Sequence, residues 1–290
     1  MLIPAAAAGG DLGSVETELT PRRLLAFAAG LGLSDECYLD DGRPGGPAMM
    51  PAMCAAIEWP LADGNASSAR MGVTLAQYRS VGVHAEQDTI FHRPPRAGET
   101  LRTSAVMESL RQTRAGVLMS LRCDSVDGDG QPVITSYMVG MLRGWKLDAP
   151  SGGTDSRDLP GPADLQADAT SETVHVPRWL PHSYSECSQI WNPIHTEREV
   201  ALAAGLPDII LHGTATWALA MDRVIRAHAG GDPRRLRRFA CRFTGMVIPG
   251  EDITVRHAGD GSGRIRVEAL DARGVPVLQH GLAEILPEAP

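Results

Sequence analysis

The sequence predicts an α+β fold built from two copies of one unit, each a helix packed on an antiparallel sheet. Each half of the 290-residue chain places helical segments first and alternating strands after them. The last two strands of each half flank a polar turn, at residues 127–133 and 271–277, as in a β-hairpin. Because the helix and the sheet each have one apolar face, the sheet must wrap the helix to bury both.

The first half is assigned to residues 1–146. A helix-like segment at residues 21–32 is followed by a second helical stretch of small and apolar residues at 49–62. Alternating strands are then expected within residues 93–110 and 116–142. A linker follows at residues 147–172, because this segment is rich in Pro, Gly, Ser and Asp and has no hydrophobic period.

The second half, residues 173–290, repeats this order. Helical segments are expected at residues 184–191 and 211–229, and strands at 245–259 and 263–286. Self-similarity over this length indicates a duplicated domain rather than a solenoid, whose periods are shorter.

Composition restricts the classes of partner. The net charge of -8 argues against a general binder of nucleic acids or anionic membranes. The five cysteines are scattered and odd in number, which favours reduced thiols in a cytoplasm. No segment approaches the roughly 20 apolar residues of a membrane helix. The N-terminus has no basic residue ahead of its short apolar run and makes a poor signal peptide. A cytoplasmic protein is therefore expected.

The stretch "SQIWNPIH", Ser188 to His195, carries the strongest functional signal. Pro193 disfavours the α region in the residue before it, which predicts a turn that holds Asn192 and His195 at the mouth of an element. Taken alone, the pattern favours a half-buried histidine in a structural turn. A second motif, "HGTATWALA" from His212, begins a predicted helix shortly afterwards.

The pairing of Asn-Pro-apolar-His with His-Gly resembles the MaoC-like dehydratases, also called type 2 or (R)-specific enoyl-CoA hydratases. Residues 83–101 resemble the non-catalytic repeat of the double-hotdog members of this family. The resemblance implies a double hotdog with one active site, in the second half, and a degenerate first half that accommodates an acyl tail. The implied substrate is an acyl thioester of CoA or of an acyl-carrier protein.

The resemblance also implies roles for single residues. His195 falls on the catalytic acid/base, and a histidine can exchange protons near neutral pH. Asn192 falls on the residue that orients the loop or the water. Gly213 falls on the glycine whose amide stabilises the thioester oxygen, and a helix start directs free N–H groups at such a charge.

One position departs from the family pattern. The place of the family's Asp is taken by Ile190, which cannot transfer a proton. Glu186 lies one helical turn earlier and could replace that carboxylate if the segment is helical, or it could be a solvated surface residue. Tyr184 and His212 are further polar candidates, and His212 is expected to line the pocket or bond the backbone. Trp191 is expected in the core or the pocket wall.

Three functions therefore stay open: hydration or dehydration of an acyl thioester, a different addition, elimination or cyclisation, and acyl binding without catalysis. No second site is expected in the first half, where Tyr38 aligns near the histidine position. His92 is expected to have a structural role. The histidines show no metal-ligand spacing, and no cofactor is indicated. A homodimer is plausible on general grounds.

Overall fold

The computed structural model describes residues 1–155, 165 and 169–287. These residues form two compact units. The described residues of the first unit lie within Met1–Thr17, Ile57–His92 and Thr100–Leu159, and those of the second within Glu18–Ala56, Arg93–Glu99 and Pro160–Pro290. Because the first part of the chain contributes to both units, they do not coincide with the two sequence repeats.

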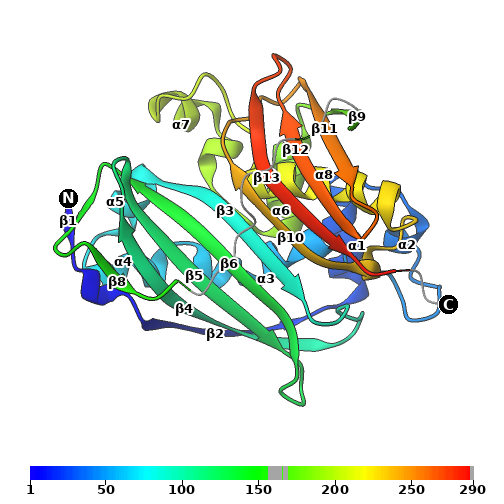
Figure 1. Ribbon diagram of the computed structural model, residues 1–290, viewed down its shortest axis with the longest axis horizontal. Coiled ribbons are helices and arrows are strands. Elements are labelled where there is room, and N and C mark those ends of the chain that lie inside the picture. The colour runs from blue at the N-terminus through cyan, green and yellow to red at the C-terminus, as the bar shows by residue number, and fades with distance from the viewer. Residues whose placement is uncertain (156–164, 166–168, 288–290) are drawn as a thin grey trace. The chain divides into compact units, whose positions relative to one another are not determined.

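The first unit is built on a sheet with the strand order β2-β4-β5-β6-β3 (Figure 1). Strands β4, β5, β6 and β3 pair antiparallel. Short strand β8 extends β4, and β1 pairs with β7 in parallel. The strand bounds are β1 Leu2–Ile3, β2 Gly10–Glu18, β3 Gly82–Phe91, β4 Thr100–Gln112, β5 Gly116–Val126, β6 Pro132–Arg143, β7 Lys146–Leu147 and β8 Ser151–Gly153.

Apolar side chains of one sheet face form the core of the first unit, together with residues from the helices. Leu61 and Met71 pack in this core with Met107 of β4, Leu121 of β5 and Met138 of β6. Helix α3 begins in the second unit and continues into the first. The helical segments are η1 Ala5–Ala7, α3 Cys54–Ala62, α4 Asn65–Met71 and α5 Leu75–Val81.

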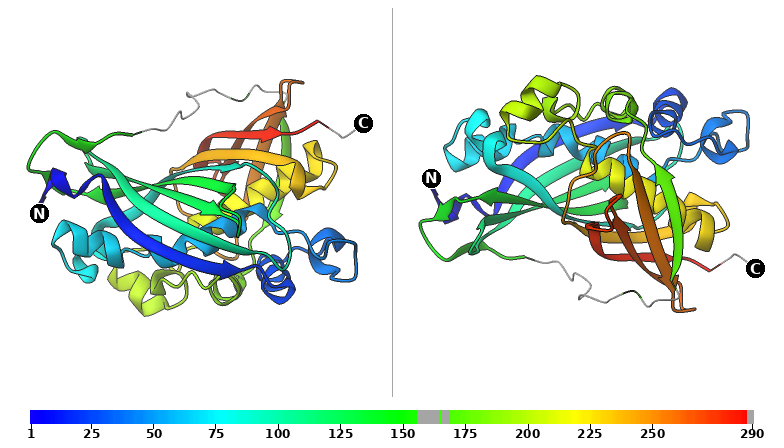
Figure 2. Two further views of the ribbon diagram at one scale, coloured as in Figure 1. Left: turned by 90° about the horizontal axis from the view of Figure 1, so that it is seen from below. Right: turned by 90° about the horizontal axis from the view of Figure 1, so that it is seen from above.

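The second unit has the strand order β10-β13-β12-β11-β9, antiparallel throughout. Helix α8 (yellow) contacts β10, β11, β12 and β13 (Figure 2). Trp217 and Met221 of α8 are fully buried, and Trp217 meets the ring of Phe239 edge to face at 6.0 Å. The strand bounds are β9 Thr170–His175, β10 Leu236–Phe243, β11 Asp252–Gly259, β12 Arg264–Leu270 and β13 Pro276–Ile285.

Several shorter elements complete the second unit. Helices α1 and α6 pack against one another, and the Ser183 hydroxyl donates a 2.8 Å hydrogen bond to the Gly30 carbonyl between them. The helical segments are α1 Pro21–Gly30, α2 Glu36–Leu39, η2 Pro51–Met53, α6 Leu180–Ser188, η3 Pro193–His195, α7 Arg198–Ala203, α8 Gly213–His228 and η4 Pro233–Arg235.

Backbone hydrogen bonds confirm the internal repeat. Residues 98–99 exchange two hydrogen bonds with Leu19, and residues 250–251 exchange the same two with Val176. Gly98 and Gly250 both have a positive φ, which a glycine adopts without strain. The two predicted hairpin turns also share one hydrogen-bond pattern, from residue 127 to 131 and from 271 to 275.

The predicted helices and strands are present with shifted ends. Helix α6 ends at Ser188, three residues before the predicted end. Strands β8 and β9 occupy parts of the predicted linker, and residues 156–164 and 166–168 of that linker lie outside the described residues. The domain boundaries inferred from the sequence stay a prediction. Among the residues that the structure describes, no helix is both long and apolar enough to cross a membrane.

Candidate active site

The chain reverses direction between α6 and η3, and this turn decides which side chains face inward. Gln189 adopts a left-handed conformation with φ of 62°. The Ser188 hydroxyl stabilises the turn, because it donates to the Tyr184 carbonyl at 2.6 Å and accepts the Ile190 N–H at 3.2 Å. Ile190 is consequently buried, whereas the next residue, Trp191, is 54% exposed.

Asn192 is the N-cap of η3 and directly precedes its first residue, Pro193. Its backbone is extended, with φ of -144° and ψ of 119°, in keeping with the restriction that proline imposes on the residue before it. Its side-chain oxygen faces the N–H of Ile194 at 3.5 Å, and its carbonyl accepts the N–H of His195 at 3.0 Å. Asn192 therefore positions His195 through the backbone.

The imidazole of His195 has a defined tautomer. Its Nδ1 lies 2.8 Å from the Ile210 carbonyl oxygen, which can only accept, so Nδ1 carries the proton. Nε2 is left with a free lone pair. Burial lowers the pKa of His195 to about 4, although the bond to Ile210 opposes this shift. At neutral pH the ring is uncharged and able to accept a proton.

His212 stacks on His195, with ring centroids 3.7 Å apart and planes at 25°. Its Nε2 lies 3.2 Å from the Ile190 carbonyl and 3.1 Å from the Ser185 hydroxyl. The carbonyl requires that Nε2 bear the proton. Burial lowers the pKa of His212, and the neighbouring His195 lowers it further. His212 thus forms a neutral, fixed wall behind the His195 ring.

Helix α8 begins next to these rings. His212 is its N-cap and Gly213 its first residue. Among the backbone hydrogen bonds of the described residues, none uses the amides of Gly213 or Thr214, as expected for the first turn of a helix. A Cβ at Gly213 would lie 3.3 Å from the Phe243 ring, so a side chain there would crowd the site. The Thr214 hydroxyl accepts a 3.0 Å hydrogen bond from Tyr184.

Glu186 lies on the surface and not beside His195. Its carboxylate accepts the indole N–H of Trp191 at 3.2 Å. Because α6 stops at Ser188 and Gln189 turns left-handed, Glu186 and Ile190 do not share a helix face: the first is exposed and the second is 4% exposed. A shallow surface pocket of about 340 Å³ is lined by His182, Glu186, Trp191, Asn192, Pro193, Thr196 and Glu197.

The structure therefore brings together His195, His212 and the start of α8, with Tyr184 against the edge of the His212 ring at 4.9 Å. Glu186 and Trp191 form a separate surface pair. Ser185 was not singled out from the sequence, because its partner His212 is 27 residues away and no local spacing signals the contact. In the described part of the chain, no three His, Cys, Asp or Glu side chains converge to hold a metal ion.

Comparisons with known proteins concern the family and the fold. Residues 181–278 match the family model described as a MaoC like domain. A protein of Dictyostelium discoideum named "Probable enoyl-CoA hydratase 2" is 29% identical over 178 residues, which cover 59% of this chain and 58% of that protein. The chain spans between 4% and 58% of the lengths of the first five curated relatives that it matches.

Solved structures share the fold. A MaoC-like dehydratase from Phytophthora capsici has a TM-score of 0.82 at 22% identity, with 96% of each chain covered. A Mycobacterium tuberculosis protein described as having a double hotdog fold has a TM-score of 0.58 at 18% identity, with 93% of each chain covered. The predicted double-hotdog fold is confirmed, and the chain carries a MaoC-like dehydratase domain at residues 181–278.

Proposed function

We propose that the protein adds water to a 2-enoyl thioester, or removes it from a 3-hydroxyacyl thioester, with His195 as its proton-transferring side chain. The observation that carries this proposal is the hydrogen bond from His195 Nδ1–H to the Ile210 carbonyl. It holds the imidazole in the tautomer whose free Nε2 can act as a base, next to the first turn of α8.

In the direction of hydration, His195 Nε2 takes a proton from water as the water oxygen bonds to C3 of the enoyl group. The double-bond electrons move toward the thioester, and negative charge develops on its oxygen. In this proposal the N–H of Gly213, at the positive end of α8, stabilises that charge. The imidazolium then returns the proton to C2, and the ring regains its neutral state.

A single base is sufficient for this sequence, which matters because Ile190 occupies the position of the family's Asp. Its buried alkyl side chain can neither orient water nor carry a proton. His212 acts as a positioning residue, since stacking and its bond to the Ile190 carbonyl fix the plane against which His195 lies. Asn192 positions His195 from the other side through its backbone carbonyl.

The test measures hydration of crotonyl-CoA and of a longer 2-enoyl-CoA by loss of the enoyl absorbance. CoA thioesters are chosen because the Dictyostelium relative is named an enoyl-CoA hydratase. We expect His195→Ala to lower kcat by 10²-fold or more, the scale of general acid-base catalysis. Gly213→Ala is expected to lower kcat, because its Cβ would make a tight 3.3 Å contact with the Phe243 ring and so shift the ring or the start of α8.

Two matched controls accompany these variants. Glu186→Gln changes a surface carboxylate bonded to Trp191 and is expected to leave kcat within about twofold. Gly128→Ala places a Cβ with no atom within 4 Å and is expected to be silent. If His195→Ala hydrates the substrate as fast as wild type does, the proposed role of His195 is contradicted. A strong loss of activity in Glu186→Gln would assign catalysis to that carboxylate.

Ile190 favours a second candidate, in which the substrate supplies its own nucleophile and His195 only removes its proton. The product is then a cyclised or otherwise substituted acyl group, and no water is added. Incubation of wild type with acyl thioesters that carry an internal hydroxyl, followed by mass spectrometry, separates the two: a product isomeric with the substrate indicates cyclisation, and a gain of one water indicates hydration.

A further inference from the structure

A cleft of about 640 Å³ lies within the second unit, and none of its lining residues belongs to the candidate active site. Three separate chain segments line it: residues 37–48, residues 93–97 and residues 230–234. Four of its side chains are arginines, Arg43, Arg93, Arg96 and Arg234, and one is an aspartate, Asp232. We call it the cationic cleft.

Two of the four arginines are neutralised by carboxylates. Arg93 pairs with Glu99 at 2.8 Å, and Arg234 pairs with Asp232 through two hydrogen bonds of 2.8 and 2.9 Å. Arg43 and Arg96 pair with no carboxylate among the described residues. The cleft therefore carries two uncompensated positive charges in a protein whose net charge is -8.

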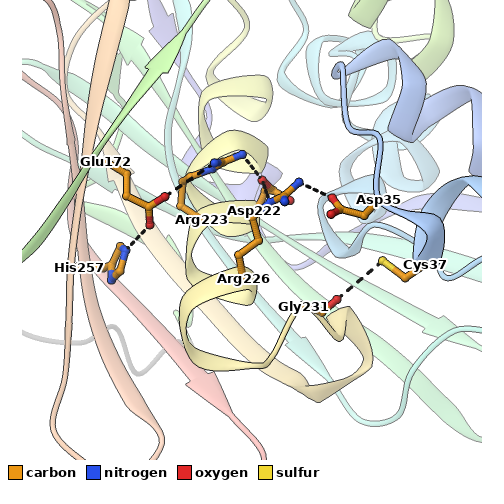
Figure 3. A network of polar contacts seen from close by, with 8 residues as sticks. All are labelled: Asp35, Cys37, Glu172, Asp222, Arg223, Arg226, Gly231 and His257. Atoms are coloured by element: carbon orange, nitrogen blue, oxygen red, sulfur yellow. Dashed lines mark hydrogen bonds and ion pairs between the residues drawn. The ribbon is translucent and has the colours of Figure 1, made fainter.

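The walls of the cleft are held by short backbone contacts. Gly46 has a φ of +73°, and a Cβ on it would lie 3.0 Å from Cβ of Ala97, so residues 37–48 and 93–97 touch there. The Cys37 thiol faces the Gly231 carbonyl at 3.7 Å, which connects the same segment to residues 230–234 (Figure 3). The three segments form one structure and not three independent loops.

Through Cys37, the cationic cleft adjoins the turn of the first repeat that corresponds to the His195 turn of the second. The N–H of Tyr38 bonds to the Asp35 carbonyl at 2.9 Å, as the N–H of His195 bonds to Asn192. These bonds match the sequence alignment of "GLSDECYLDD" with "QIWNPIHTER". The first repeat has therefore kept the backbone of the site.

Two more backbone bonds extend the correspondence. The N–H of Ala48 bonds to the Cys37 carbonyl, and the N–H of Ile210 bonds to Ile194 at the matching positions. The N–H of residue 99 bonds to residue 96, and that of residue 251 bonds to residue 248, both at 3.3 Å. Arg96 thus lies in the turn that corresponds to residues 248–251.

The first repeat has lost the proton-transfer group. Tyr38, at the histidine position, is 1% exposed. Burial raises its pKa, and the nearby carboxylate of Asp222 adds to this shift. A phenol of this kind keeps its proton throughout the neutral range, so this copy is suited to binding and not to acid-base chemistry.

We propose that the cationic cleft is a second, non-catalytic site that binds a phosphate-bearing small molecule. Arginine presents a planar fork of N–H donors that matches two phosphate oxygens at once. The negative end of α8 is near residues 230–234, but its partial charge of about half an electron is smaller than the two free guanidinium charges. This proposal goes beyond the reaction proposed above and does not depend on it.

Two sources of the phosphate group are tested separately: the nucleotide of CoA and free inorganic phosphate. Binding to the full chain is measured by isothermal titration calorimetry at constant ionic strength, with adenosine 3′,5′-bisphosphate in one arm and inorganic phosphate in the other. A higher affinity for the bisphosphate indicates the CoA nucleotide, and equal affinities indicate a site for free phosphate. Neither arm requires turnover, so a failed hydratase assay does not affect the result.

The variants test the location of the site. We expect Arg43→Gln/Arg96→Gln to weaken binding by about tenfold or more for each guanidinium removed. Arg102→Gln/Arg111→Gln, which removes two exposed arginines from β4, is the control for net charge and is expected to bind like wild type. Should the first double variant unfold, Arg96→Gln alone is used, because Arg96 is exposed.

Three outcomes would overturn the proposal. The first is the absence of saturable binding of either compound to wild type at millimolar concentration. The second is binding that persists unchanged in the Arg96 variants. The third is an equal loss in the β4 control, which would indicate attraction by overall charge and not a site.

Discussion

At the scale of single residues, the neutral state of His195 is the property on which the proposed chemistry depends. Its position after Asn-Pro and the resemblance to the MaoC-like family make it a candidate from the sequence alone. Its tautomer was not accessible in this way, because the acceptor is the backbone carbonyl of Ile210, fifteen residues away. The pairing of His212 with Ser185 and with the Ile190 carbonyl escaped sequence analysis for the same reason.

The lowered pKa of His195 predicts an unusual pH profile. A base must be unprotonated to work, and His195 binds a proton only near pH 4, whereas a solvated histidine does so near 6.5. We therefore expect kcat/KM for hydration to stay level from about pH 8 to about pH 5 and to fall below that. The measurement is kcat/KM against pH, with circular dichroism at each pH to confirm that the protein is folded.

An acid limb near pH 6.5 would show that His195 is solvated during turnover and not buried as described. The lowered pKa of His195 also makes the free energy of unfolding decrease at acidic pH. A pKa lowered by folding means that the unfolded chain binds the proton more readily. Stability is therefore lost as pH falls from about 6.5 toward 4.

At the scale of elements, the end of helix α6 at Ser188 decides whether Glu186 can lie on the same side as Ile190. Glu186 and Ile190 have the spacing of one helical turn, yet the left-handed Gln189 separates them. A polar residue with positive φ is uncommon and leaves little trace in a sequence. The first three residues of strand β9 were assigned to the linker because this polar segment has no hydrophobic period, and only pairing with β11 identifies it as a strand.

Helix α8 contains a buried carboxylate, Asp222, and its removal tests how much the ion pairs of this helix contribute to stability. Asp222 is 1% exposed and pairs with Arg223 at 2.6 Å and with Arg226 at 2.9 Å (Figure 3). Arg226 also contacts Asp35, and Arg223 reaches Glu172 at 3.7 Å. Asp222→Asn is expected to lower the free energy of unfolding by about 2 kcal/mol, because two partly exposed guanidinium groups lose the buried carboxylate that they share, although each keeps a second carboxylate.

Urea denaturation of wild type and Asp222→Asn measures this difference. Glu199→Gln, an exposed acidic residue in the first turn of α7, is the control and is expected to change stability by less than about 1 kcal/mol. A loss of equal size in the two variants would indicate that overall charge matters, and no loss in Asp222→Asn would show that the network does not stabilise α8.

At the scale of the whole molecule, a buried acid in α3 is expected to influence stability across the physiological pH range. Glu58 is fully buried, and burial raises its pKa to about 8, with Ser136 partly opposing and Asp124 adding to the shift. The unfolded chain releases this proton near pH 4.5, whereas the folded chain keeps it up to about pH 8. Stability should therefore fall as pH rises between these values, by about 1.4 kcal/mol per pH unit.

Glu58→Gln isolates this effect, because glutamine has nearly the same shape and does not titrate. We expect the variant and wild type to be similarly stable near pH 4.5, and the variant to gain relative to wild type as pH rises to 8. Chemical denaturation at four or five pH values measures the difference in free energy of unfolding between wild type and Glu58→Gln. The histidines contribute equally to both proteins, so their contributions cancel in this difference. A difference that stays constant with pH would contradict the buried, protonated state.

The sequence was sufficient to infer the duplicated architecture because its hairpin turns and glycines recur in both halves. It could not reveal that residues 18–56 and 93–99 join the second unit, since that depends on contacts between segments far apart in the chain. The cationic cleft was missed for the same reason: its arginines come from three separate segments, and no local spacing connects them.

The preserved backbone of the first repeat also bears on how such a protein can change during evolution. The N–H of Tyr38 already donates to the Asp35 carbonyl, as the N–H of His195 donates to Asn192 in the other copy. A mutation to histidine there would place an imidazole on a prepared main chain, without an insertion or a new loop. A histidine can therefore appear or disappear at this position by point substitution, while the architecture that carries it stays the same.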